Sequence, residues 1–337
     1  MCEDAVLSEA CLISLATATA VVGARRSCEE EEEEEEASSL ASELDGSSAA
    51  VFPALASAAL VGIYVLFARF QGVLVSAMAF ASLWSLHFTA RPYVGGLAWP
   101  VAGVVVCCWL LTGHWVLLDV LGACTCVACV ALVRVPNLRV ACLCLGSLLA
   151  YDVFWILGSA SVFGGDNVMV TVASRAANNP VGPPLQLPIK LVVPACSGFS
   201  LLGLGDVAIP GLALALARRF DRYLAAEARS PVAADARRWR RPDTVSGRRS
   251  SITAKRPRRL SYLAVATTGY AGGLALACAT AARFGPQPAL VYLVPACVLP
   301  IIVAALLRGN DHLKLLWRGL EEGGDEDHPE EKSRGVN

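Results

Sequence analysis

Charged residues are scarce in this chain. Only 17% of its 337 residues are Asp, Glu, Lys or Arg, whereas 55% are apolar, and the mean hydropathy is +0.54. A soluble domain carries about a quarter charged residues. The shortage of charge therefore argues against an ordinary soluble globular protein and predicts a membrane protein.

Signatures of several other functional classes are also missing. The sequence has no zinc-ligand spacing, phosphate-binding loop, dinucleotide-binding fingerprint or Ser/His/Asp pattern, so we expect no cofactor and no metal ion. Most of the 13 cysteines fall in apolar segments, which predicts free thiols rather than a disulfide scaffold. CTCVAC (residues 124–129) resembles a metal site. On a helix, however, Cys124 and Cys126 would face different sides with no His or acid nearby, so we interpret it as packing.

Long apolar segments are abundant, by contrast. Nine stretches of about 20 residues predict transmembrane helices, and the fold class is therefore all-α, a polytopic membrane protein of about nine spans. The predicted spans are roughly 5–24, 49–68, 71–90, 95–113, 115–133, 138–161, 199–217, 262–281 and 287–307. Arg25 and Arg26 follow the first segment rather than precede it, which favours an uncleaved anchor over a signal peptide.

The few charges are strongly segregated. Glu29–Glu36 is an unbroken run of glutamates and residues 218–259 are densely basic, so we expect both in aqueous loops. With the N-terminus outside the cytosol, 24 of the 28 Lys and Arg residues fall on the cytosolic side, as the positive-inside rule requires. We expect the basic loop to be disordered and cytosolic and to contact anionic lipid head groups, with no nucleic acid as partner.

Two carboxylates interrupt apolar spans at matching positions. Asp152 lies in LLAYDVFWIL (148–157) and Asp206 in LLGLGDVAIPG (201–211). Span six runs outward and span seven returns, so both acids are expected roughly 10–14 Å below the same membrane face. Antiparallel neighbouring helices can bring such groups together. Two carboxyls in one site share a proton, so that one can activate water while the other polarises a carbonyl.

Neighbouring residues suit such a site. Gly203 and Gly205 leave room beside Asp206 for another backbone, and Tyr151 can place its ring or phenol at the pocket edge. Transport remains the main alternative, because proton-coupled carriers also bury aspartates in the membrane. A non-proteolytic scaffold and a pair of acids that merely satisfy other polar groups are further alternatives.

Other polar residues are expected to be structural. We interpret His114, beside Trp115, as an interfacial residue of the aromatic belt. Asp119, one turn inside span five, is expected to pair with an exoplasmic base or to cap its helix. Asp166 is expected to be solvated, and Asp221 to mark the cytosolic end of span seven.

Three motifs in fixed order resemble a known family. YDVFW (151–155), LGLGDVAIPG (202–211) and QPALVYLVP (287–295) look like the intramembrane aspartyl proteases of the presenilin and signal peptide peptidase group. LTGHW (111–115), VRVPNL (133–138) and ASRAANNPVG (173–182) are most similar to the signal-peptide-peptidase-like branch typified by the Golgi shedding protease and its plant and algal relatives. Signal peptide peptidase proper is the near alternative.

The resemblance implies a presenilin-like fold and an active site. Its catalytic pair would be Asp152 and Asp206. The residues that would shape the site and position substrate are Tyr151, Gly203, Leu204, Gly205, Pro288, Ala289 and Leu290. The implied function is cleavage of type II membrane proteins, or of signal-peptide remnants, within or near their transmembrane segments.

The same resemblance suggests how the chain is organised. Residues 1–48 would be an anchor helix with an acidic and Ser-rich cytosolic linker, 49–310 a multi-span protease core with a disordered basic loop at 221–260, and 311–337 a cytosolic tail. We expect an integral protein of the endomembrane system, Golgi favoured and ER or endosome as alternatives, with a homodimer left open.

A helical substrate must unwind before its amides can be attacked. NVMVTVA (167–173) and LQLPIKLVV (185–193) have β-prone compositions. We hypothesise that LQLPIKLVV offers a strand edge to the unwound substrate, so that proline at Ile189 or Leu191 would reduce cleavage without changing expression.

Overall fold

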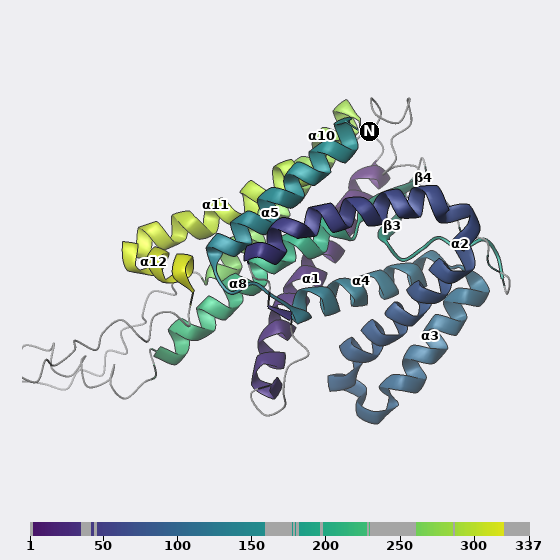
Figure 1. Ribbon diagram of the computed structural model, residues 1–337, viewed down its shortest axis with the longest axis horizontal. Coiled ribbons are helices and arrows are strands. Elements are labelled where there is room, and N and C mark those ends of the chain that lie inside the picture. The colour runs from purple at the N-terminus through teal and green to yellow at the C-terminus, as the bar shows by residue number, and fades with distance from the viewer. Residues whose placement is uncertain are drawn as a thin grey trace, which may run out of the picture.

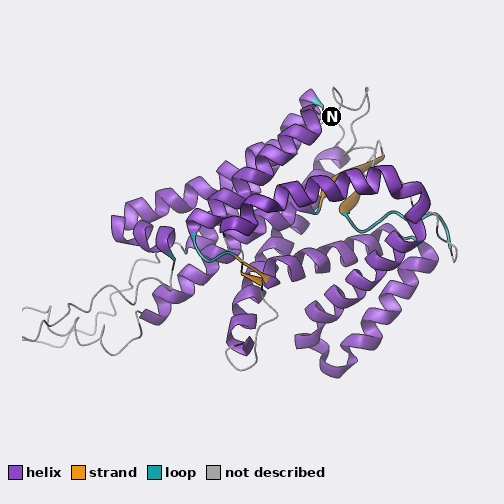
Figure 2. Ribbon diagram, viewed as in Figure 1, coloured by secondary structure: helices purple, strands orange, loops and turns teal. Residues whose placement is uncertain are grey.

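A computed structural model of the chain describes residues 3–34, 42–43, 46–158, 177, 179, 182–195, 198–227, 229, 261–285 and 287–319. Its α-helices are α1 (Glu3–Glu34), α2 (Gly46–Val94), α3 (Ala98–Thr112), α4 (Trp115–Leu132), α5 (Leu138–Val153), α8 (Gly205–Glu227), α10 (Tyr262–Phe284), α11 (Leu290–Arg308) and α12 (Asn310–Arg318). A 3₁₀ turn, η1 (Gly95–Leu97), precedes α3, and a π-helical turn, η2 (Phe154–Gly158), continues α5. The predicted all-α class is confirmed (Figures 1 and 2).

Six helical segments among the described residues are long and apolar enough to cross a membrane. They are Val6–Glu29, Gln71–Thr112, Trp115–Leu132, Leu138–Gly158, Tyr262–Phe284 and Leu290–Arg308. The predicted count of nine is therefore not confirmed. Predicted spans 49–68 and 71–90 belong to one helix, α2, which turns sharply within its length (Figure 1).

The start of predicted span seven is wrong. Residues 198–203 form strand β4 (Gly198–Gly203), and α8 begins only at Gly205. Glycines at 198, 203 and 205 weaken helix formation here. The backbone polar groups are instead satisfied by pairing with β3 (Lys190–Ala195). Asp206 therefore lies in the first turn of a helix, directly after a strand, and not inside a continuous helix.

Strands β3 and β4 form an antiparallel pair in which Leu191 faces Leu202 and Val193 faces Ser200. The prediction of a strand in LQLPIKLVV is confirmed for residues 190–193, whereas NVMVTVA lies outside the described residues. A second, parallel pair joins β1 (Ser42–Glu43) to β2 (Val133–Arg134). The β3–β4 pair lies beside the N-terminal part of α1 (Figure 2).

Two apolar cores hold the helices together. The larger joins α1, α4, α5, α8, α10 and α11, and the smaller joins α2, α3 and α4 to the segment before β3. Helices α10 and α11 approach closely because Gly269 and Gly273 lack side chains. A Cβ atom on Gly269 would lie 2.0 Å from the carbonyl oxygen of Ala296, and one on Gly273 would lie 2.6 Å from the Cβ of Ala296.

Candidate active site

Asp152 lies at the end of α5 and is almost completely buried, with 4% of its surface exposed. Helix α5 starts from an Asn137 cap, whose side-chain oxygen accepts from the N–H of Val140 at 2.9 Å. Two residues after Asp152, at Phe154, the backbone changes to the π-helical turn η2. Such turns interrupt regular helix hydrogen bonding and are frequent at functional sites.

Asp206 lies at the start of α8 and is half-buried. The Tyr270 hydroxyl of α10 donates to the backbone carbonyl of Asp206 at 3.2 Å, which fixes the first turn of α8. A Cβ atom on Gly203 would lie 3.3 Å from Oδ2 of Asp206, so the absence of a side chain there keeps space around the carboxylate. Tyr270 was not foreseen from the sequence, since a tyrosine in an apolar span carries no signal of its partner.

The structure brings Asp152 and Asp206 together. Asp152 lies at the end of α5 and Asp206 at the start of α8, and these two helices pack against each other and against α11. The sequence predicts that these two residues are neighbours, although Asp206 reaches its position from a strand-to-helix junction and not from within a continuous helix.

The Pro288–Ala289–Leu290 segment lies at the same site. Helix α11 begins at Leu290, and the N–H of Leu290 donates to Oδ2 of Asp152 at 3.3 Å. The carbonyl of Ala289 accepts from Leu293 at 3.1 Å, so the segment is held as the first turn of a helix. Leu290 is therefore the member that touches an acid directly.

The remaining predicted site residues are close neighbours of the two acids in the sequence. Tyr151 is half-buried, and its ring centre lies 6.3 Å from that of Trp155. The N–H of Leu204 donates to the carbonyl of Ile189 at 3.1 Å, which extends the β3–β4 pairing by one residue. Gly205 is the first residue of α8.

The outer edge of β3 is occupied. Oδ1 of Asp119 accepts from the N–H of Val192 at 2.7 Å, and the Ser8 hydroxyl donates to the carbonyl of Pro194 at 2.6 Å. Because Val192 bonds to Asp119, the alternate residues Leu191 and Val193 bond to β4. The hypothesis that β3 offers its edge to substrate is therefore wrong. Proline at Leu191 would break the hairpin itself.

The outer edge of β4 pairs with no other strand in the described part of the chain. The register directs the backbone polar groups of Phe199, Leu201 and Gly203 away from β3, and within the described part of the chain β3 is the sole strand that pairs with β4. Phe199 and Leu201 are more than half exposed. Lys190, which pairs with Gly203 across the hairpin, is buried, and this burial lowers the pKa of its ammonium group.

Asp119 differs from expectation, and His114 has a structural role beyond the one expected of it. Asp119 binds a strand N–H, pairs with no basic side chain among the described residues, and is not the cap of its helix. The cap of α4 is His114, whose Nδ1 accepts from Val116 at 3.2 Å while its ring stacks with Trp115 at 5.8 Å. An acid inside an apolar span was the available signal for Asp119, but its partner, 73 residues away, was not deducible.

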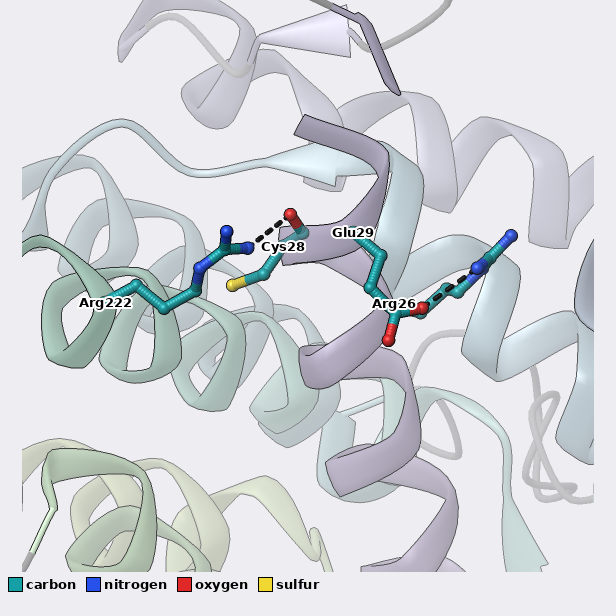
Figure 3. Close-up of polar contacts among 4 residues, drawn as sticks. All are labelled: Arg26, Cys28, Glu29 and Arg222. Carbon is teal, nitrogen blue, oxygen red and sulfur yellow. Dashed lines mark hydrogen bonds and ion pairs between the residues drawn. The ribbon is translucent and has the colours of Figure 1, made fainter. Parts of the chain in front are cut away.

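The far end of α8 is anchored by charged residues. Arg222 donates to the backbone carbonyl of Cys28 in α1, next to the Arg26–Glu29 ion pair of 2.9 Å (Figure 3). The carboxylate of Asp221 accepts from the N–H groups of Tyr262 at 2.8 Å and Leu263 at 2.9 Å, and so caps α10. These contacts fix α8, and with it the position of Asp206.

The cysteines that the structure describes are free thiols. Within CTCVAC, Cys126 is buried and its Sγ donates to the carbonyl of Leu204 at 3.5 Å. No group of three His, Cys, Asp or Glu residues capable of holding a metal ion occurs in the described part of the chain. Asp166 lies outside it.

A helical protein with several membrane-length segments and two neighbouring acids is typical of intramembrane aspartyl proteases. Comparison with known proteins identifies the family. The sequence model of the signal peptide peptidase family matches residues 96–322. Signal peptide peptidase-like 1 of Arabidopsis thaliana and its namesake of Oryza sativa subsp. japonica are each 32% identical, with 82% of both chains covered. Human signal peptide peptidase is 31% identical over 62% of this chain and 46% of its own length. No solved structure matches.

The chain therefore belongs to the signal peptide peptidase family. It is an integral membrane protein with the function of an intramembrane protease. This membership supports the protease interpretation over the proton-coupled transporter. All the residues expected at the site lie within the matched segment.

Proposed function

We propose that this chain is an aspartyl endopeptidase that hydrolyses transmembrane segments with Asp152 and Asp206. The observation that carries the proposal is the convergence of the two carboxyl groups at the junction of α5, α8 and α11. The three helices pack against one another there, and the N–H of Leu290 donates to Oδ2 of Asp152. An acid pair inside a membrane protein is costly and usually functional.

The chemistry follows from two acids that share one proton. The ionised carboxylate takes a proton from a water molecule as the water oxygen attacks the carbonyl carbon of the scissile amide. The protonated carboxyl donates a hydrogen bond to the carbonyl oxygen and stabilises the gem-diol that forms. Proton transfer to the amide nitrogen then breaks the C–N bond. Because the pair titrates as a unit, the two roles belong to the dyad.

The unwound part of the substrate pairs with β4 in this proposal. The outward N–H and C=O groups of Phe199, Leu201 and Gly203 form an edge that no second strand of the described residues covers, and it ends three residues before Asp206. An extended chain that adds to this edge exposes its amides and reaches the acids in a defined register. The space left by Gly203 beside Asp206 lets a backbone approach.

The natural substrates in this proposal are type II membrane proteins or signal-peptide remnants. The N-terminus lies in the lumen and the C-terminus in the cytosol, supported by the 24 of 28 basic residues that this topology puts on the cytosolic side. The proposed compartment is the endomembrane system. The Golgi is favoured over the ER or endosome because the motifs at residues 111–115 and 173–182 resemble those of the Golgi-type branch. Membrane lipids contact the apolar helices, and a homodimer is the proposed assembly.

Co-expression with a tagged type II membrane protein tests this function. The wild-type chain should release a soluble fragment, and Asp152→Ala and Asp206→Ala should each abolish its release at equal membrane abundance. Gly272→Ala is a suitable control, because a Cβ atom there meets nothing within 4 Å. Undiminished release from either aspartate variant would refute the two-aspartate mechanism.

A further inference from the structure

One face of α4 holds the segment that carries Asp206. Asp119, Gly122 and Cys126 are spaced so that they lie on the same side of the helix. Each contacts the β3–β4 hairpin or the loop that follows it. The hydrogen bonds of Asp119 and Cys126 go to Val192 and Leu204 rather than to the acid pair. Their effect on the reaction would therefore pass through the backbone that they hold.

Asp119 provides the polar contact. Its carboxylate is 7% exposed and accepts from the buried N–H of Val192 at 2.7 Å. This N–H is directed away from β4 and would otherwise be a buried donor at the outer edge of β3. Pro194, two residues on, has no N–H to offer. The bond therefore sets where the centre of β3 lies along α4.

Gly122 and Cys126 hold the next part of the segment. A Cβ atom on Gly122 would lie 3.3 Å from Cδ1 of Leu204 and 3.6 Å from Cδ2 of Leu191, so α4 approaches both side chains closely. The Sγ of Cys126 donates to the carbonyl of Leu204 at 3.5 Å. Leu204 directly precedes α8, and Asp206 follows two residues later.

We propose that Asp119 is a positioning residue for the cleavage reaction, acting with Gly122 and Cys126 to fix the β3–β4 hairpin and the start of α8 against α4. The proposal rests on the proposed role of Asp206 and of the β4 edge. A displaced hairpin changes both the position of one acid and the register of the paired substrate. Loss of the contact should therefore alter which peptide bond is cut as well as the rate.

Two substitutions of Asp119 separate positioning from chemistry. Asp119→Asn keeps an oxygen that can accept from Val192 but cannot exchange a proton, whereas Asp119→Val removes the acceptor and leaves a buried N–H. The loss of a buried hydrogen bond predicts a rate lower by about five- to 100-fold for Asp119→Val. The released fragments, measured by mass spectrometry on a tagged type II substrate, should spread over several cleavage positions. Asp119→Asn should retain the wild-type position and most of the rate.

Gly122→Val provides a second arm that leaves the polar contact intact. The added side chain would displace Leu204 and should shift the cleavage position. Gly103→Val in α3 is the matched control, since a Cβ atom there meets nothing within 4 Å, and it should leave rate and position unchanged. Membrane abundance and melting temperature in detergent are measured for every variant. If Asp119→Val does not accumulate in the membrane, the cleavage position of Gly122→Val tests the positioning role instead.

Three outcomes would overturn the proposal. The first is a wild-type rate and cleavage position in Asp119→Val. The second is an activity of Asp119→Asn as low as that of Asp206→Asn. The third is an identical rate and cleavage position for Gly122→Val and Gly103→Val. Asp206→Asn also separates this proposal from the proposed function. If Asp206→Asn cleaves normally, the two-aspartate mechanism fails, whatever the Asp119 variants do.

Discussion

The close packing of α10 against α11 makes a sharp prediction for Gly269→Ala. The new Cβ atom would lie 2.0 Å from the carbonyl oxygen of Ala296 and 3.1 Å from Cγ of Pro300. An ordinary contact needs about 3.4 Å or more, so the two helices must separate by roughly 1 Å. Overpacking of this kind costs about 1–3 kcal/mol. Ala296 lies less than two turns from Leu290, so the separation also moves the N–H group that binds Asp152.

Gly272→Ala in the same helix isolates the steric effect. Both substitutions gain about 1 kcal/mol of helix propensity, but a Cβ atom on Gly272 meets nothing within 4 Å. Gly269→Ala should melt at a lower temperature in detergent than Gly272→Ala. It should also release fragment about tenfold more slowly or worse, because a shift of about 1 Å at a catalytic site can cost 100-fold. Equal melting temperatures and equal rates for the two variants would refute this packing argument.

Two further predictions concern the hairpin and the end of α8. Leu201→Pro removes an outward N–H of β4 and should therefore lose most fragment release. Leu201→Ala keeps the N–H and should lose much less. Equal fragment release from both variants would contradict pairing of substrate with β4. Asp221→Ala removes two acceptors at the start of α10 and leaves the Ser261 hydroxyl, which accepts from Ala264. It should lower the free energy of unfolding by about 0.5–2 kcal/mol, measured as a lower melting temperature in detergent. An unchanged melting temperature would show that the Asp221 contacts are dispensable.

Much of the helical architecture was predictable from the sequence, because apolar segments of about 20 residues are a strong local signal. The two acids were also identifiable, since Asp152 and Asp206 are isolated carboxylates in apolar stretches of the sequence. The start of predicted span seven is wrong because the apolar content of residues 199–203 is that of a membrane helix. Only the pairing of residues 198–203 with β3, which is a contact between separate segments, makes those residues a strand.

The same limit explains why parts of the site were missed. Val192 binds Asp119 across 73 residues, and Tyr270 binds the backbone of Asp206 across 64. Neither pairing leaves a periodic pattern in the sequence. The sequence likewise predicts that a substrate pairs with β3 rather than with β4. A β-prone composition identifies a strand but not which of its edges is covered.

Hydrolysis by the purified chain in water enriched in oxygen-18 tests the central claim most directly. The protein is reconstituted in lipid vesicles with one defined type II transmembrane substrate, and the new carboxyl terminus of the product is analysed by mass spectrometry. The wild-type chain should form product that carries one oxygen-18 atom from the attacking water, and Asp152→Asn and Asp206→Asn should form none. Labelled product at the wild-type rate from either variant would contradict the account.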